Sequence, residues 1–440
     1  MKEIARNYYL DQLISKMHNG KVKIVTGIRR CGKSYLLSPL FKNYLLSNGI
    51  KKDQIIEIAL DRKEFEDLRN PNNLYSYILV RISEEKQFYI FIDEIQLSYR
   101  VKKTGIDESL IPEADRDLIY TTFYDVLNDL RSRPNVDVYV TGSNSKLLSK
   151  DVATNFRDRG TEIRMHPLSF SEFYSVSGKE KPDAWEDYIV YGGMPLAVLE
   201  DDEREKARYL SDLFRKVYIA DVIERYNVTD SYVEEIIDIL SSAVGSLTNP
   251  TKLANTLNTV AHIGTSDKTV KRYLDILEDA FLFSKARRFD VKGKHYIESP
   301  AKYYAEDIGL RNARLNFRQT EETHLMENII YNDLVRRGYM VDVGVVKYAE
   351  KENGNKAEKQ HEIDFVVNCG DRKIYIQSAL SIADDNKRIQ EVTPLLRSGD
   401  FFKKLVIVGG NQKMRLDENG IAYVGVIRFL LNEDILETYA

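Results

Sequence analysis

The segment from Gly27 to Ser34 constrains this chain more than any other part of the sequence. It reads GIRRCGKS and fits the pattern G-x-x-x-x-G-K-[S/T] at every fixed position. A short apolar run at residues 22–25 precedes it, and a pattern typical of a helix follows over residues 33–47. A strand, a glycine-containing turn and a helix in this order predict a loop that binds phosphate through backbone N–H groups and the helix N-terminus.

The residue types in this loop each have a chemical reason. Glycine leaves room for a phosphate because it has no Cβ, while Lys33 is expected to reach the β- and γ-phosphates and the Ser34 hydroxyl to ligate Mg²⁺. The predicted nucleotide contacts are Gly27, Ile28, Arg29, Arg30, Cys31, Gly32, Lys33, Ser34 and Tyr35. A chance match is the alternative, but it leaves the correct placing of both flanking elements unexplained. We therefore expect a nucleoside triphosphate, or its diphosphate, bound with Mg²⁺.

A second motif is an apolar run that ends in two acids. Residues 88–92 read FYIFI, and Asp93 and Glu94 follow directly. A buried strand avoids carboxylates, so the pair is expected at the carboxyl end of the strand, where open parallel sheets bind ligands. Asp93 is predicted to hold the hydrated Mg²⁺, and Glu94 to activate the attacking water as a general base, which favours hydrolysis. Two surface acids at the start of a loop are the alternative.

Two further polar segments could complete such a site. The apolar run at residues 136–140 leads into Thr141, Gly142, Ser143 and Asn144, of which Ser143 or Asn144 is expected to touch the γ-phosphate or the attacking water. An ordinary turn has the same composition. A guanidinium in the segment from 155 to 160 could stabilise the transferring charge, from the same chain or from a neighbouring subunit, or it could be a solvated basic turn.

The whole chain divides into three parts on its patterns. Strands alternate with helices over residues 1–180, which predicts an α/β domain with a parallel sheet. Residues 181–302 read as helices followed by two short strands around a turn at 290–293, which suggests a winged helix. Residues 303–440 read as a second, smaller α/β or α+β domain.

A stretch rich in basic residues could bind DNA. The formal net charge is -4, so attraction to nucleic acid must come from a local patch. Basic residues outnumber acids over residues 268–302, and the possible contacts to double-stranded DNA are Lys268, Lys271, Arg272, Arg287, Arg288, Lys292 and Lys294. Residues 265–267 would cap the helix that enters the groove. A winged helix used only for packing, with a solvated basic face, is the alternative.

Cellular location is expected to be the cytoplasm. The chain has 2 cysteines, which argues against a disulfide scaffold and fits a reducing compartment. The first residues are too polar for a signal peptide, and no apolar run has the length of a membrane span. We therefore expect no membrane partner.

Several segments together resemble a known family. Residues 141–149, Arg159, the segment PLSFSEF at 167–173 and the segment YGGMP at 191–195 resemble a prokaryotic AAA-superfamily P-loop ATPase joined to a C-terminal domain of unknown function, DUF4143. The resemblance implies an AAA-like core, a helical and winged-helix middle, and a C-terminal domain related to restriction endonucleases. It implies ATP as the nucleotide and Arg159 as an arginine finger or sensor. Asp158 stands where the family commonly has glycine.

The C-terminal domain departs from an active nuclease. A nuclease of this fold type needs a helical glutamate, a strand aspartate, and a glutamate and a lysine on the next strand. Glu327 and Asp364 match the first two, but Gln377 and Ala379 stand at the other two positions. We expect a nuclease-like fold without activity. Lys373 or Lys387 could replace the missing lysine, although nothing in the sequence indicates it.

The sequence thus favours an ATP-hydrolysing switch or motor that rearranges its attached domains. The first alternative is a DNA-binding regulator gated by ATP binding, and the second is an ATP-gated nuclease. Glu94 argues against the first alternative, and Gln377 with Ala379 argues against the second. A protein partner or a second copy of the chain is compatible with each reading.

Overall fold

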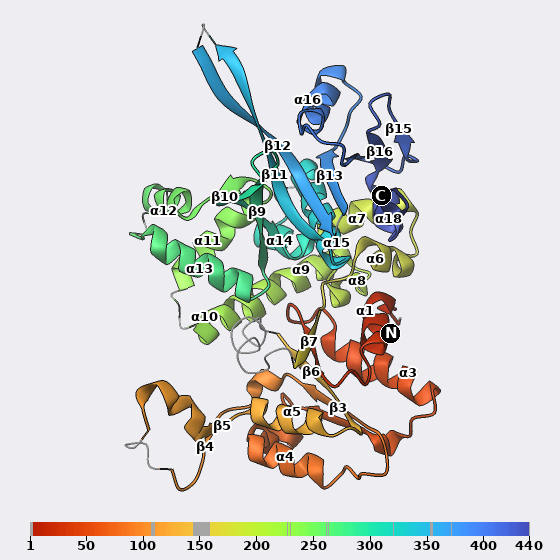
Figure 1. Cartoon of the computed structure of the whole chain (residues 1–440), viewed down its shortest axis with the longest axis vertical. Helices are drawn as coiled ribbons and strands as arrows, with labels where there is room; N and C mark the ends of the chain where they lie inside the picture. The colour runs from red at the N-terminus through yellow and green to blue at the C-terminus, as the bar shows by residue number, and fades with distance from the viewer. Residues whose placement is uncertain are drawn as a thin grey trace. The chain divides into compact units, whose positions relative to one another are not determined.

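The computed structural model describes residues 3–106, 111–143, 159–226, 228, 230–260, 262, 264–319, 321–352, 355–370 and 372–439. They form two compact units, Glu3–Met165 and His166–Ala440 (Figure 1), and each is described by itself. The three-part division expected from the sequence, with boundaries at 180/181 and 302/303, stays a prediction.

The first unit is built on a parallel sheet, as the alternation of strands and helices predicts. Its strands are β1 (Val22–Thr26), β2 (Ile55–Ala59), β3 (Phe88–Asp93), β6 (Val136–Gly142) and β7 (Gly160–Arg164). The spatial order is β2-β3-β6-β1-β7. All neighbours are parallel, so the carboxyl ends of the strands share one edge. Because β6 lies between β1 and β3, the carboxyl end of β6 lies between the phosphate loop and the acid pair.

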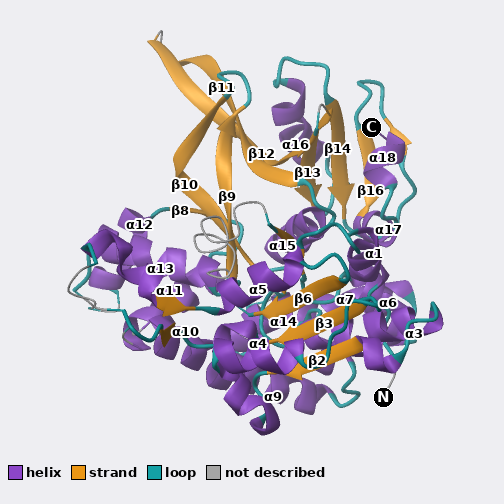
Figure 2. Cartoon of the chain, turned by 60° about the horizontal axis from the view of Figure 1, so that its bottom comes forward, coloured by secondary structure: helices purple, strands orange, loops and turns teal. Residues whose placement is uncertain are grey.

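Helices cover both faces of this sheet (Figure 2). The helical elements are α1 (Asn7–Ser15), α2 (Lys33–Tyr35), η1 (Leu36–Phe41), α3 (Lys42–Ser47), η2 (Lys52–Gln54), η3 (Lys63–Arg69), α4 (Pro71–Leu79), η4 (Ile95–Leu97), η6 (Glu113–Ile119) and α5 (Phe123–Ser132). The first helix after the phosphate loop has a π-helical middle, η1, that contains Pro39. Proline has no N–H to donate and crowds the preceding turn, which explains the wider turn there.

The two faces of β3 pack against different helices. Ile90 and Ile92 share a core with α4 and α5 residues such as Leu74 and Leu127. Phe91 faces the opposite way, toward Phe41 of η1, with ring centroids 5.6 Å apart. Since successive side chains alternate, Asp93 points to the same face as Phe91, which is the face of the helix that follows the phosphate loop. The polar stretch after β3 contains a small two-stranded sheet of β4 (Val101–Lys102) and β5 (Tyr120–Thr121).

The second unit begins with helices. They are α6 (Phe170–Ser177), α7 (Lys181–Tyr191), α8 (Pro195–Val198), α9 (Glu203–Leu213), η9 (Phe214–Ile219), α10 (Ala220–Tyr226), α11 (Asp230–Ser242), α12 (Pro250–Thr259) and α13 (Asp267–Asp279). Further along the chain come α14 (Ile308–Arg314), α15 (Glu322–Arg336), α16 (Asp385–Leu396), α17 (Val426–Leu431) and α18 (Ile435–Tyr439). Among the described residues, no helix is long and apolar enough to cross a bilayer.

One mixed sheet of nine strands runs through this unit. Its strands are β8 (Leu247–Thr248), β9 (Phe283–Asp290), β10 (His295–Ala305), β11 (Met340–Glu352), β12 (Asn355–Cys369), β13 (Arg372–Ala379), β14 (Lys403–Val408), β15 (Arg415–Leu416) and β16 (Ala422–Gly425), in the order β15-β16-β14-β13-β12-β11-β9-β10-β8. The two strands that the sequence assigns to the middle region, β9 and β10, join the C-terminal strands because β9 pairs in parallel with β11. The far halves of β11 and β12 pair only with each other and run out as a ribbon (Figure 1).

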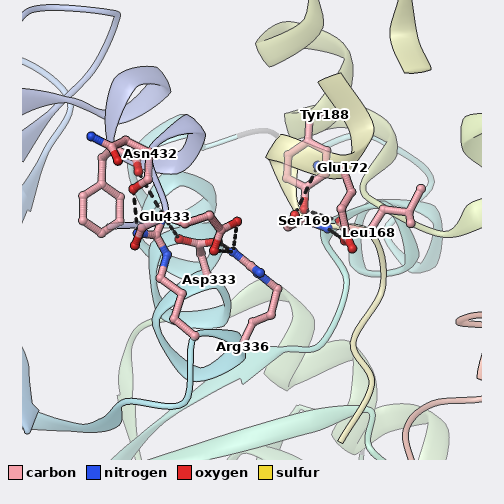
Figure 3. A network of polar contacts seen from close by, with 10 residues as sticks. Leu168, Ser169, Glu172, Tyr188, Asp333, Arg336, Asn432 and Glu433 are labelled. Atoms are coloured by element: carbon pink, nitrogen blue, oxygen red, sulfur yellow. Dashed lines mark hydrogen bonds and ion pairs between the residues drawn. The ribbon is translucent and has the colours of Figure 1, made fainter. Parts of the chain in front are cut away.

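Helices α15 and α16 contribute to two different cores around this sheet. Ile330 of α15 packs with Phe365 and Phe429, whereas Leu395 of α16 packs with Tyr375. A polar network fixes the end of α15 (Figure 3). Arg336 binds Asp333 at 2.9 Å and Glu433 at 2.7 Å. The neighbouring Arg337 donates to the carbonyls of Phe429 and Asn432, which caps the end of α17.

Candidate nucleotide site

The phosphate loop follows β1 and opens α2, as the motif predicts. Gly27 has φ 138° and Gly32 has φ 106°, and both conformations favour glycine. A Cβ on Gly27 would lie 2.0 Å from the carbonyl oxygen of Met165, which is backbone and cannot move aside. The first glycine is therefore required both by its backbone angle and by the close approach of the segment after β7.

Lys33 is held within the loop. Its side chain is buried, and Nζ donates to the carbonyl oxygens of Gly27 at 2.9 Å and Ile28 at 3.0 Å. A phosphate oxygen is charged and accepts a stronger hydrogen bond than a neutral carbonyl does. The ammonium is thus at the loop and able to exchange these carbonyls for an anion.

A buried arginine that sequence reasoning missed supports the loop. Arg6 is 2% exposed, and its NH1 donates to the carbonyl oxygen of Cys31 at 3.2 Å. Its guanidinium also lies over the ring of Tyr9, 4.7 Å from the centroid. The chain just before α1 therefore fixes the middle of the phosphate loop. A single arginine in a polar N-terminal segment gives no signal from which this contact could be predicted.

The acid pair lies at the carboxyl end of β3, held by Thr141. Glu94 has φ 54° and ψ 49°, a left-handed conformation that costs a non-glycine residue free energy. Thr141 at the end of β6 is fully buried, and its Oγ1 accepts the Glu94 N–H at 3.0 Å and donates to Asp93 Oδ1. One hydroxyl thus fixes the carboxylate of one acid and the backbone of the next. The sequence offered a weak signal, a threonine directly after an apolar strand.

Ser143 joins the same cluster. Its Oγ lies 3.4 Å from Glu94 Oε2, and Gln96 donates to that same Oε2 and to Ser143 Oγ, the latter at 3.3 Å. Ser143 and Glu94 are therefore neighbours, and the expected contact of Ser143 with the γ-phosphate or the attacking water stays a prediction. Asn144, the other expected residue, lies outside the described residues.

A cavity is lined by Ser34 of the phosphate loop and by Asp93 of the acid pair. It has a volume of about 340 Å³, and residues of β2, η1 and η3 line it together with Lys42 of α3 and Arg62. A hydroxyl and a carboxylate oxygen on one cavity are the hard oxygen donors that Mg²⁺ takes in proteins, usually with waters completing its octahedron. The donor set at Ser34 and Asp93 therefore fits the metal expected from the sequence.

Arg159 lies at the other end of the sheet from the phosphate loop. Its carbonyl oxygen accepts the N–H of Val22 at 2.9 Å, at the amino end of β1. The loop begins at the carboxyl end of that strand, about 15 Å away at the usual rise per residue. This distance exceeds the reach of an arginine side chain. Its expected role as an arginine finger or sensor stays a prediction. At this distance Arg159 could act only on the phosphate loop of a second copy of the chain.

The expected DNA contacts lie mostly at the surface. Lys268, Lys271, Arg272, Arg287, Lys292 and Lys294 are exposed. Ser266 caps α13 by accepting the N–H of Thr269 at 3.2 Å, as expected. Arg288 differs, since it is 5% exposed and donates to Gln360 Oε1 at 3.1 Å. Its burial makes it a poor candidate for a phosphate contact, which alternation along a strand explains.

The nuclease-like positions also come together, with an unexpected lysine. Gln377 Oε1 accepts from the backbone N–H of Asp364 at 3.4 Å. Lys373 is not near the acids, since its Nζ lies over the rings of Phe289 and Phe402. Lys302 of β10 reaches Glu327 instead, at 2.8 Å. Sequence reasoning assigned Lys302 no role, although a lysine between apolar residues in a strand is a signal of a buried ion pair.

Three domain families match consecutive parts of the chain. Residues 19–174 match an AAA domain, residues 182–321 match a domain of unknown function, DUF8612, and residues 322–428 match a domain of unknown function, DUF4143. The AAA domain at the amino-terminal end and DUF4143 at the carboxyl-terminal end confirm the resemblance found in the sequence.

The chain also has relatives along nearly its whole length. An uncharacterized protein of Haemophilus influenzae is 32% identical over 435 residues, which are 97% of this chain and 98% of the relative. An uncharacterized protein of Methanocaldococcus jannaschii is 27% identical over 390 residues, 84% of this chain and 77% of the relative. Among solved structures, the Walker-type ATPase of Pyrococcus abyssi matches with a TM-score of 0.47 and 13% identity, over 71% of this chain and 96% of that one. That similarity is too low to support a conclusion about function.

Proposed function

This chain belongs to the AAA-domain proteins that carry a C-terminal DUF4143 domain, and we propose that it binds ATP with Mg²⁺ and hydrolyses it. Hydrolysis then drives a change in the domains attached to the ATPase unit. One observation carries the proposal, namely that Thr141 and Ser143 hold Asp93 and Glu94 at the sheet edge where the phosphate loop also lies.

The chain's own residues have separate roles in this proposal. Lys33 exchanges its loop carbonyls for the β- and γ-phosphates and neutralises their charge. Ser34 and Asp93 supply oxygen ligands, and Mg²⁺ when bound stabilises the negative charge on the phosphates. Glu94, aimed by Gln96 and Ser143, accepts a proton from the attacking water. Thr141 keeps both acids in place.

A DNA-dependent role is the second candidate, and the element order of the middle region favours it. From α11 to β10 the elements run helix, strand, helix, helix, strand, strand, which is the order of a winged helix. The basic residues at the start of α13 and in the turn after β9 are exposed on this region. In this reading ATP binding, rather than turnover, regulates attachment to double-stranded DNA through phosphate contacts.

One assay separates the two candidates. ATP turnover is measured for the wild type and for Lys33→Ala, with and without duplex DNA at low salt, and the DNA is inspected for cleavage. We expect Mg²⁺-dependent turnover in the wild type, at least 100-fold less in Lys33→Ala, and intact DNA. Absence of turnover together with ATP-dependent DNA binding would replace the first candidate by the second. ATP turnover that DNA does not change, together with no DNA binding, would rule out the second candidate.

A further inference from the structure

A cluster in the second unit holds one buried ammonium among three carboxylates, and ATP hydrolysis makes no use of it. Glu327 and Asp364 are buried, whereas Glu362 is partly exposed. The ammonium is Lys302 Nζ, whose side chain is 4% exposed. The oxygens around it are Glu327 Oε1 at 2.8 Å, Glu362 Oε1 at 2.7 Å and Asp364 Oδ1 at 3.8 Å. A lysine ammonium has three donors. The oxygens of Glu327 and Glu362 lie at hydrogen-bond distance, and Asp364 Oδ1 lies at ion-pair distance.

The members of this cluster come from three elements far apart in the sequence. Lys302 lies on β10, Glu327 on α15, and Glu362 and Asp364 on β12. Tyr304, two residues along β10, donates its hydroxyl to Glu327 Oε1 at 2.7 Å. The cluster therefore ties the strand of the middle region to the helix and the strand that carry the nuclease-like acids.

The electrostatics show why a cation is needed at this point. Burial of carboxylates without a counter-charge costs several kcal/mol each. Burial alone would lower the pKa of Lys302, but the charges of Glu327, Asp364 and Glu362 together raise it above its ordinary value. Lys302 therefore carries its positive charge at neutral pH. Removing the lysine would leave an uncompensated group of acids.

The distances from Lys302 Nζ to the surrounding carboxylate oxygens are those of an ammonium site. Glu327 and Asp364 are the acids that a nuclease of the expected fold would use for a divalent cation. Mg²⁺ binds oxygen at about 2.1 Å, whereas Lys302 lies 2.7–2.8 Å from its two nearest oxygens, the length of a charge-assisted hydrogen bond. In the part of the chain that the structure describes, no group of three acids, histidines or cysteines is arranged for a metal ion.

We propose that the Lys302 ammonium occupies the place of the divalent cation in this nuclease-like domain. The cation site is thereby filled by the chain itself and fastens β10 to α15 and β12. An ammonium, rather than a metal ion, then balances the acids in a domain where Gln377 and Ala379 stand at the other two nuclease positions. Their present arrangement fits the ammonium, and once the lysine is removed the same acids are expected to close around a hard divalent cation.

The test compares thermal unfolding in EDTA and in excess Mn²⁺, without nucleotide, for the wild type, Lys302→Met and Lys302→Arg. Lys302→Met is expected to lower the unfolding midpoint by roughly 10 °C in EDTA, and Mn²⁺ is expected to restore most of that loss. Lys302→Arg keeps a cation, so it is expected to respond to Mn²⁺ no more than the wild type does. Adding Asp364→Asn to Lys302→Met is expected to abolish the response.

Two results would overturn the proposal. One is a Mn²⁺ response of the wild type that Asp364→Asn removes, since the cluster would then already take a metal. The other is a folded Lys302→Met variant that Mn²⁺ leaves unchanged. If Lys302→Met does not fold, Mn²⁺ binding to the wild type and to Asp364→Asn is compared by electron paramagnetic resonance. Equal binding supports the proposal, and binding lost in Asp364→Asn refutes it.

Discussion

Thr141 has the central position among the residues of the nucleotide site. Its single buried hydroxyl makes one hydrogen bond to the carboxylate of Asp93 and another to the backbone N–H of Glu94. In the proposed mechanism, the first bond orients a metal ligand, and the second stabilises the left-handed backbone of the general base. Thr141 touches neither nucleotide nor water in this account, so it is a positioning residue. Loss of a group that orients a metal ligand commonly lowers the metal affinity or the activity of the site.

Substitution of Thr141 tests this role. Thr141→Val keeps the shape and removes both bonds, so we expect ATP turnover to fall about 10- to 100-fold, with a higher Mg²⁺ requirement. Thr141→Ser keeps the hydroxyl and is expected to restore most of the activity. ATP turnover measured across a Mg²⁺ titration gives both quantities. Equal loss of activity in the two variants, at unchanged Mg²⁺ dependence, would show a packing role instead.

The elements of the first unit follow closely from the sequence, while those of the second do so only in part. The phosphate loop and β3 are recognisable because local periodicity and glycine spacing determine them. The neighbours of a strand are set by contacts between distant segments, so the pairing of β9 with β11 and the place of Lys302 could not be predicted. The role of Thr141 could not be predicted for the same reason, since its partner Asp93 lies on the neighbouring strand of the sheet.

Helix α13 offers a pH test of the middle region. Burial, opposed by Lys285, raises the pKa of Glu278 to about 7. A folded-state pKa above the unfolded value means that the folded state binds the proton more tightly, so stability is lost as pH rises from about 4.5 to 7.

Glu278→Gln is expected to remove this pH dependence and to raise the unfolding midpoint at pH 8. The gain arises because the amide carries no charge to desolvate. Chemical denaturation at a series of pH values measures it, with the exposed Glu186→Gln as the control. A variant that keeps the wild-type pH profile would contradict the burial of this carboxyl.

At the scale of the whole molecule, the proposed function assigns ATP hydrolysis to the first unit and the resulting structural change to the second. The position of Arg159 bears on whether one copy of the chain is sufficient for ATP hydrolysis. Its position at the amino edge of the sheet separates it from the phosphate loop of the same chain. If Arg159 completes the proposed site, it does so on a second copy of the chain, by stabilising the transition state in trans.

A mixing experiment checks this requirement. Arg159→Ala and Lys33→Ala are each expected to be inactive alone, the first for lack of a donated charge and the second for lack of nucleotide binding. Mixed chains are expected to regain part of the turnover, because a site with intact Lys33 can receive Arg159 from its neighbour. Full activity of Arg159→Ala alone would remove Arg159 from the mechanism.

The central claim is that Glu94 activates water at a site where ATP binds without its help. The most direct test measures ATP binding and ATP turnover in Glu94→Gln beside the wild type. We predict unchanged ATP affinity in the presence of Mg²⁺ and turnover reduced by at least 100-fold, the usual contribution of a general base. Wild-type turnover in Glu94→Gln, or no ATP binding by the wild type, would contradict the account.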